Sequence, residues 1–232
     1  MMKMKEIKKI IEDPVHGKKF YTESNLIMLK RKLIEIYNVL QIKGLDKRKI
    51  IEIVSEFVKD NVSYKKSYFD CFTGKSKIFD YNNVKYRTAY GALVEGEAMC
   101  AGYAEALRIL LGLYDIESYT VLSKLPLERK KLLHYVVVAE ANNSCGKYMV
   151  LDPESKQYCE KNKIDYDSYM ESCIYMIPDR IFTDDVLGKD GSGMLAEDYL
   201  KSSNVPRVTG TKKINELIRY IDRKTCIIEE ER

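Results

Sequence analysis

The chain has 232 residues, a length that is sufficient to bury a substantial core within one domain. Apolar residues make up 45% of it and charged residues 32%, proportions that are ordinary for a globular protein and exclude a disordered or collagen-like chain. The formal net charge is +4, and no apolar stretch approaches the roughly 18 residues of a membrane span.

The N-terminal region, residues 1–50, is basic, with 13 Lys or Arg against 6 Asp or Glu. Such a surplus suits nucleic acid or an acidic partner, but no aromatic residues are interleaved with these charges in a recognisable pattern. Solvated helix faces are therefore favoured, no nucleic-acid or membrane partner is expected, and a basic interaction protein remains a rival interpretation. Residues 1–17 lack a continuous apolar stretch and a cleavage site, which is typical of an amphipathic helix and predicts a cytoplasmic protein.

Two helices are predicted after this region. Apolar residues recur at spacings of three and four over residues 23–41, and Asp46 is expected to cap a helix whose apolar face runs from Ile50 to Val58. A polar, tyrosine-rich connection follows over residues 61–85.

The next block predicts the helix that carries the chemistry. Thr88 is expected to cap a short helix through Val94, and Gly96 breaks it. A longer helix is then predicted from Cys100 to Leu113, with an apolar face of alanines and leucines.

Three strands are predicted after this helix, over residues 117–123, 132–141 and 146–151. The turn at residues 142–145 makes the last two a hairpin that ends at Asp152. Beyond it the pattern weakens. Residues 182–207 are expected to form loops, and Thr211 is expected to cap a final helix over residues 211–222. The order of elements predicts an α+β fold, in which a helix packs on an antiparallel sheet.

Cys100 is the candidate nucleophile. A cysteine in a cytoplasmic protein is more often a small buried hydrophobe, but Cys100 follows a glycine-broken loop and opens a helix, where N–H groups and the dipole stabilise a thiolate. The small residues Ala101 and Gly102 leave space for a substrate. The six cysteines include no C-x-x-C pair, and neither of the two histidines lies in a cluster with ligand spacing. The cysteines are therefore expected to be free thiols, and no metal or other cofactor is expected.

His134 and Asp152 are the candidate partners of this thiol. His134 begins an apolar strand, whereas the other histidine, His16, lies in a Pro/Gly-flanked segment. A hairpin centred on residue 143 would bring His134 and Asp152 to the same open end of the ribbon. There the carboxylate could fix the imidazole tautomer while the second ring nitrogen faces Cys100. Taken singly, a histidine at a sheet edge and an aspartate in a turn would each be structural.

These segments resemble the core of the transglutaminase-like superfamily, whose cysteine enzymes share a papain-like arrangement. The resemblance covers roughly residues 50–155 and rests on G-x-x-C-x-G-Y-A around the cysteine, LLHYVVV, and YMVLDPES. It implies a Cys100, His134 and Asp152 triad, with Gly102 and Tyr103 as the small and aromatic residues that follow the nucleophile.

The chain departs from that pattern in having no tryptophan to donate to an oxyanion. We hypothesise that the Cys100 N–H is one donor and that the hydroxyl of Tyr64 or Tyr90 is the second, although packing is favoured for both tyrosines.

The implied activity is acyl transfer from amide bonds of a peptide or protein substrate through a thioester, with peptidase-like hydrolysis slightly ahead of deamidation or transamidation. A catalytically silent, transglutaminase-like protein-binding module is the alternative. The predicted organisation is a helical extension over residues 1–45, a catalytic core over 46–180 and a loop-rich, helical extension over 181–232, within one globular unit.

Overall fold

The computed structural model describes residues 21–65, 85–126, 133–142, 147–176 and 206–219. The predicted N-terminal helix, most of the tyrosine-rich connection, the hairpin turn and the predicted loops up to residue 205 lie outside these ranges. The described elements are α2 (Glu23–Leu40), α3 (Lys47–Asn61), β1 (Ser63–Tyr64), α5 (Ala89–Leu93), β2 (Glu97–Ala98), α6 (Cys100–Gly112), β3 (Ser118–Lys124), β4 (Leu133–Asn142), β5 (Lys147–Leu151), α7 (Pro153–Asn162), α8 (Tyr166–Glu171), β6 (Ile174–Met176), β7 (Arg207–Thr209) and η4 (Thr211–Lys213).

The predicted helix starts follow from capping side chains. Asp46 accepts a hydrogen bond from the N–H of Lys49 at the start of α3, and Thr88 accepts one from Gly91 at the start of α5. Gly96 ends that segment with a φ of +74°, a conformation that glycine adopts without strain. Within the described ranges, no helix combines the length and apolar character that a membrane span requires.

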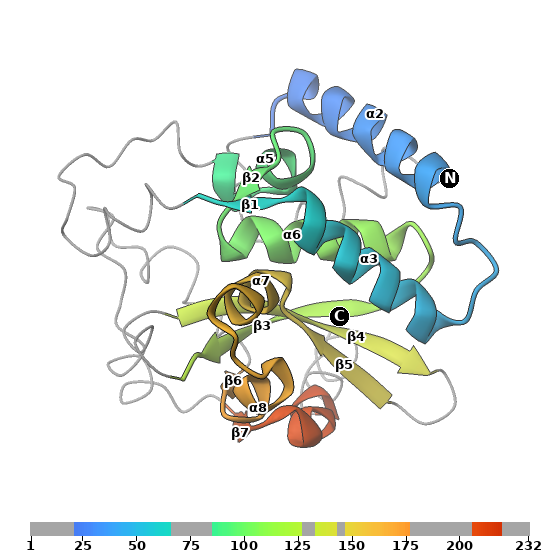
Figure 1. Cartoon of the computed structure of the whole chain (residues 1–232). Coiled ribbons are helices and arrows are strands. Elements are labelled where there is room, and N and C mark those ends of the chain that lie inside the picture. The colour runs from blue at the N-terminus through green and yellow to red at the C-terminus, as the bar shows by residue number, and fades with distance from the viewer. Residues whose placement is uncertain (1–20, 66–84, 127–132, 143–146, 177–205, 220–232) are drawn as a thin grey trace, which may run out of the picture.

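Strands β3 to β7 form one antiparallel sheet in the order β5-β4-β3-β6-β7. Helices α3 and α6 contact β4 on one face, and α2 packs outside them against α5 (Figure 1). On the opposite face, α8 and residues 211–219 contribute to a second apolar cluster (Figure 1). The expected α+β fold, with the helix of Cys100 packed on an antiparallel sheet, is therefore confirmed.

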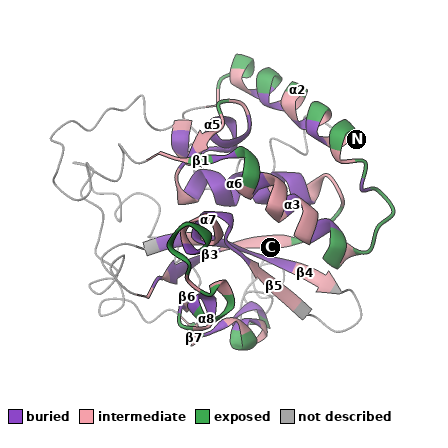
Figure 2. Cartoon of the chain, viewed as in Figure 1, coloured by how far each residue is buried: buried purple, intermediate pink, exposed green. Residues whose placement is uncertain are grey.

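Strand β4 is buried on both faces, which explains its continuous apolar run. Val137 and Ala139 belong to the cluster beneath α6, whereas Val136 and Val138 belong to the cluster on the other face. This alternation is the two-residue period of a strand. Figure 2 shows the contrast between the buried α6 and the exposed outer surface of α2.

The hairpin register differs by two residues from the one predicted. Val137 pairs with Leu151, so the same register continued would bring residue 152 opposite 136 and residue 154 opposite His134. A register shift between Glu140 and Asn142 lies next to the turn. Because side chains alternate with a period of two, an offset of two residues leaves His134 and Asp152 on the same side of the ribbon.

The weak pattern after Pro153 conceals regular structure. Asp152 is the N-cap of α7 and Pro153 occupies its first turn, where the missing N–H has no cost. The predicted final helix begins as η4 and continues helically to residue 219, with Gly210 and not Thr211 at its cap position. The side chain of Thr211 instead donates a hydrogen bond to Glu171.

Candidate active site

Cys100 opens α6 at a helix start that has no side-chain cap. The preceding residue, Met99, is extended and makes no capping hydrogen bond, in contrast to Asp46 of α3 and Thr88 of α5. No capping side chain therefore occupies the first-turn N–H groups of α6, and these groups can stabilise a negative charge beside Cys100. Cys100 is partly exposed, whereas Cys159 and Cys173 are fully buried.

The first turn of α6 is held against its neighbours by close backbone contact. The N–H of Met99 donates to the carbonyl of Tyr86 at 2.8 Å, and a Cβ at Gly102 would lie only 2.6 Å from that same oxygen. Tyr103 is buried, and its hydroxyl donates to the carbonyl oxygen of Val62 at 2.6 Å. These contacts fix the helix that carries Cys100, and the substrate-binding role of Gly102 and Tyr103 stays a prediction.

His134 lies near the start of β4, opposite Ser123 of β3, and is almost completely buried. Its Nε2 atom is 2.8 Å from Oδ2 of Asp152. Burial by itself lowers the pKa of His134, but the carboxylates of Asp152 and Glu154 more than offset this, so the pKa lies well above its ordinary value. A hydrogen bond with the Cys100 thiol acts in the same direction. The imidazole is thus bonded by the Asp152 carboxylate at Nε2, and a ligand atom of Cys100 lies within 4.8 Å of the ring.

Asp152 has two structural partners, one for each carboxylate oxygen. Oδ2 faces His134, while Oδ1 accepts a hydrogen bond from the N–H of Ser155 at 2.9 Å and caps α7. Burial alone would raise the pKa of Asp152, but the charge and hydrogen bond of His134, with the Ser155 contact, lower it overall. Asp152 is therefore ionised and its orientation is fixed by the start of a helix.

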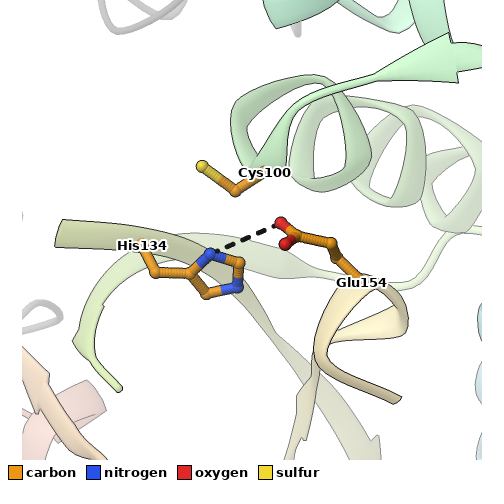
Figure 3. A group of neighbouring side chains, drawn as sticks. All are labelled: Cys100, His134 and Glu154. Carbon is orange, nitrogen blue, oxygen red and sulfur yellow. Dashed lines mark ion pairs between the residues drawn. The ribbon is translucent and has the colours of Figure 1, made fainter. Parts of the chain in front are cut away.

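Glu154 is a member of the cluster that the sequence analysis did not identify. It lies in the first turn of α7, is buried, and brings its Oε2 atom to 3.5 Å from Nδ1 of His134 (Figure 3). Potential ligand atoms of Cys100, His134 and Glu154 all lie within 4.8 Å of one another. The available sequence signal was Asp-Pro-Glu, in which an N-cap and a helix-starting proline aim the next acidic residue back toward the strand end.

The two tyrosines proposed as oxyanion donors occupy different places. Tyr90 lies on α5, with its hydroxyl 3.6 Å from the sulfur of Met28 in α2. Tyr64 ends β1 and pairs with Ala98 of β2, two residues before Cys100. The short β1–β2 ladder therefore brings Tyr64 close to the start of α6 in the fold, and a donor role for either hydroxyl stays a prediction.

The chain is similar to known proteins in sequence and in fold. A family profile described as "Transglutaminase-like domain" matches residues 31–176, which is more than half of the chain. A solved structure described as "Crystal structure of a TGase" is similar at 12% identity with a TM-score of 0.45. The similarity covers 65% of this chain and 37% of that chain, so this chain corresponds to well under half of that protein. No curated protein matches the sequence.

Proposed function

Because the chain belongs to the transglutaminase-like family, as the match over residues 31–176 shows, we propose that it is a cysteine-dependent acyl-transfer enzyme. Its substrates in this proposal are amide bonds of peptides or proteins. The observation that carries the proposal is the partly exposed thiol of Cys100 beside a buried imidazole, whose far nitrogen lies 2.8 Å from the carboxylate of Asp152. This is the arrangement that nucleophilic catalysis by cysteine requires.

The first step of the proposed reaction forms a thioester. The Cys100 thiolate attacks the carbonyl carbon of the amide, and the negative charge that develops on oxygen faces the uncapped start of α6. The His134 imidazolium then gives its proton to the departing nitrogen as the C–N bond breaks. The amine leaves, and the acyl group remains on the sulfur of Cys100.

The second step releases the acyl group. His134, now neutral, takes a proton from the incoming nucleophile, which attacks the thioester carbon while the C–S bond breaks. Cys100 departs as a thiolate beside the imidazolium that Asp152 stabilises, which restores the starting state. Hydrolysis by water is the outcome placed first, because water needs no second binding site. An amine acceptor would give transamidation by the same residues.

The test of this proposal is the rate at which iodoacetamide alkylates Cys100 at neutral pH, followed by peptide mapping. Loss of His134 removes the cation that pairs with the thiolate, so His134→Ala is expected to slow alkylation by about 10-fold or more. His16→Ala changes the other histidine of the chain and serves as the matched control, with no expected effect. Burial raises the pKa of Cys173 to about 11, so this thiol is expected to react slowly in every variant.

Equal alkylation rates in wild type and His134→Ala would contradict the proposal. They would mean that the imidazole does not activate the thiol, and they would favour the catalytically silent protein-binding module. Circular dichroism of both variants separates that result from a loss of folding.

A further inference from the structure

The cluster of Cys100, His134 and Glu154 contains one sulfur, one nitrogen and one oxygen ligand. Each residue offers a ligand atom, and these atoms lie within 4.8 Å of one another. Zn²⁺ binds these three ligand types, at about 2.3 Å for sulfur and 2.0–2.2 Å for nitrogen and oxygen. Hard cations such as Mg²⁺ and Ca²⁺ instead require oxygen ligands, so the donor set selects a borderline-soft divalent ion.

The distance between the ligand atoms of His134 and Glu154 is close to that of a tetrahedral site. Two ligand atoms about 2 Å from an ion and about 109° apart are separated by roughly 3.3 Å. Nδ1 of His134 and Oε2 of Glu154 are already 3.5 Å apart. The remaining adjustment falls on the side chain of Cys100, which is partly exposed and can move without disturbing the core. Figure 3 shows Glu154 facing His134, with Cys100 beside them and its sulfur turned away from the other two side chains.

The second nitrogen of His134 is held as it is in many zinc proteins. Asp152 binds Nε2 at 2.8 Å, which keeps a proton on that nitrogen, so the proton that an incoming ion must displace is the one on Nδ1, the nitrogen beside Glu154. The capping bond from Ser155 to Asp152 fixes this carboxylate in turn. The site therefore has both its direct ligands and the outer carboxylate that orients the histidine.

We propose that Cys100, His134 and Glu154 form a three-ligand binding site for Zn²⁺ or a similar divalent ion, and that ion binding silences the thiol. The bound ion would coordinate the sulfur and Nδ1, so neither could attack or transfer a proton. With three protein ligands, the fourth coordination position is left to water. The silencing rests on the proposed function, whereas the binding does not. In this proposal the ion is an inhibitor, not a cofactor of the reaction.

The test is a titration of the full chain with Zn²⁺ in competition with a chromophoric chelator. Wild type is expected to bind one ion in this site, and Glu154→Gln is expected to weaken that binding by at least about 10-fold, since loss of even an outer partner costs 10–100-fold. Cys100→Ser tests the sulfur ligand at a partly exposed position that tolerates the change. Glu160→Gln is the matched control, because Glu160 lies on the same helix but pairs with Lys59 at the surface.

Unchanged affinity in both Glu154→Gln and Cys100→Ser would overturn the inference, because the ion would then bind elsewhere. Failure of the wild-type protein to bind Zn²⁺ would overturn it as well. An excess of Mg²⁺ is expected not to displace the ion. Protection of Cys100 from iodoacetamide by Zn²⁺, lost in Glu154→Gln, tests the silencing. If alkylation proves indifferent to His134, the proposed function fails, while the chelator titration still decides the binding site.

Discussion

Replacing Asp152 with asparagine is expected to slow acylation of Cys100 by an activated ester by about 10²- to 10⁴-fold while the protein remains folded. The capping bond from the N–H of Ser155 keeps an oxygen in the Oδ1 position, so the amide nitrogen of the new side chain must face Nε2 of His134. Nε2 then has to accept, which leaves the ring proton on Nδ1, facing Cys100. A histidine in that tautomer cannot take the proton of the thiol.

The measurement is the release of p-nitrophenol from p-nitrophenyl acetate, with the acetylated Cys100 peptide identified by mass spectrometry. Asp165→Asn is the matched control, because Asp165 caps α8 by accepting from the N–H of Ser168 but has no histidine partner. Asparagine caps helices about as well as aspartate, so both helix starts are kept, but Asp152→Asn also loses the buried charge pair with His134 and is expected to unfold at a lower urea concentration than Asp165→Asn. An Asp152→Asn protein with normal acylation would remove Asp152 from the proposed mechanism.

The helix of Cys100 and the strand of His134 could be predicted because their signals are local. A glycine break before Cys100 and an apolar face behind it define a helix start within a few residues. The β-branched run after His134 predicts a strand whatever the rest of the chain does. The order of these segments then carries the family resemblance, which the profile over residues 31–176 confirms.

Glu154 could not be found in the same way, because its proximity to His134 depends on non-local geometry. The sequence places a turn near residue 143, but the observed pairing, such as Val137 with Leu151, differs by two residues from a hairpin centred there. The sequence also leaves open that Asp152, which directly follows the strand, caps the next helix. A helix that starts directly after the strand end is needed to bring Glu154 back onto the imidazole.

The short strands β6 and β7 were missed for a different reason. Each has three residues, too few for an alternating pattern to be recognised. They are strands because β3 offers an edge to β6, and β6 in turn offers one to β7. Elements whose existence depends on a neighbour leave little trace in the sequence.

Substitution of Gly102 by alanine is expected to reduce the free energy of unfolding by about 2–3 kcal/mol. The new Cβ would lie 2.6 Å from the carbonyl oxygen of Tyr86 and 3.1 Å from that of Thr88, both of which are backbone atoms. The first turn of α6 must then move away from residues 86–88, and Cys100 moves with it. Urea denaturation measures the loss of stability, and iodoacetamide alkylation measures the displacement of the thiol.

A double variant separates the contacts that resist this methyl group. The third close neighbour is Cβ of Ala98 at 2.9 Å, so Ala98→Gly removes that clash and leaves both carbonyls in place. We therefore expect Gly102→Ala with Ala98→Gly to remain destabilised. Recovery of stability would show instead that only the Ala98 side chain excludes a larger residue.

If Gly102→Ala left stability and alkylation unchanged but blocked acylation by a bulky ester, Gly102 would serve substrate approach, as predicted from its small size. The contacts at Tyr86 and Thr88 argue for packing, because a backbone that already fills the space beside Gly102 leaves none there for a substrate.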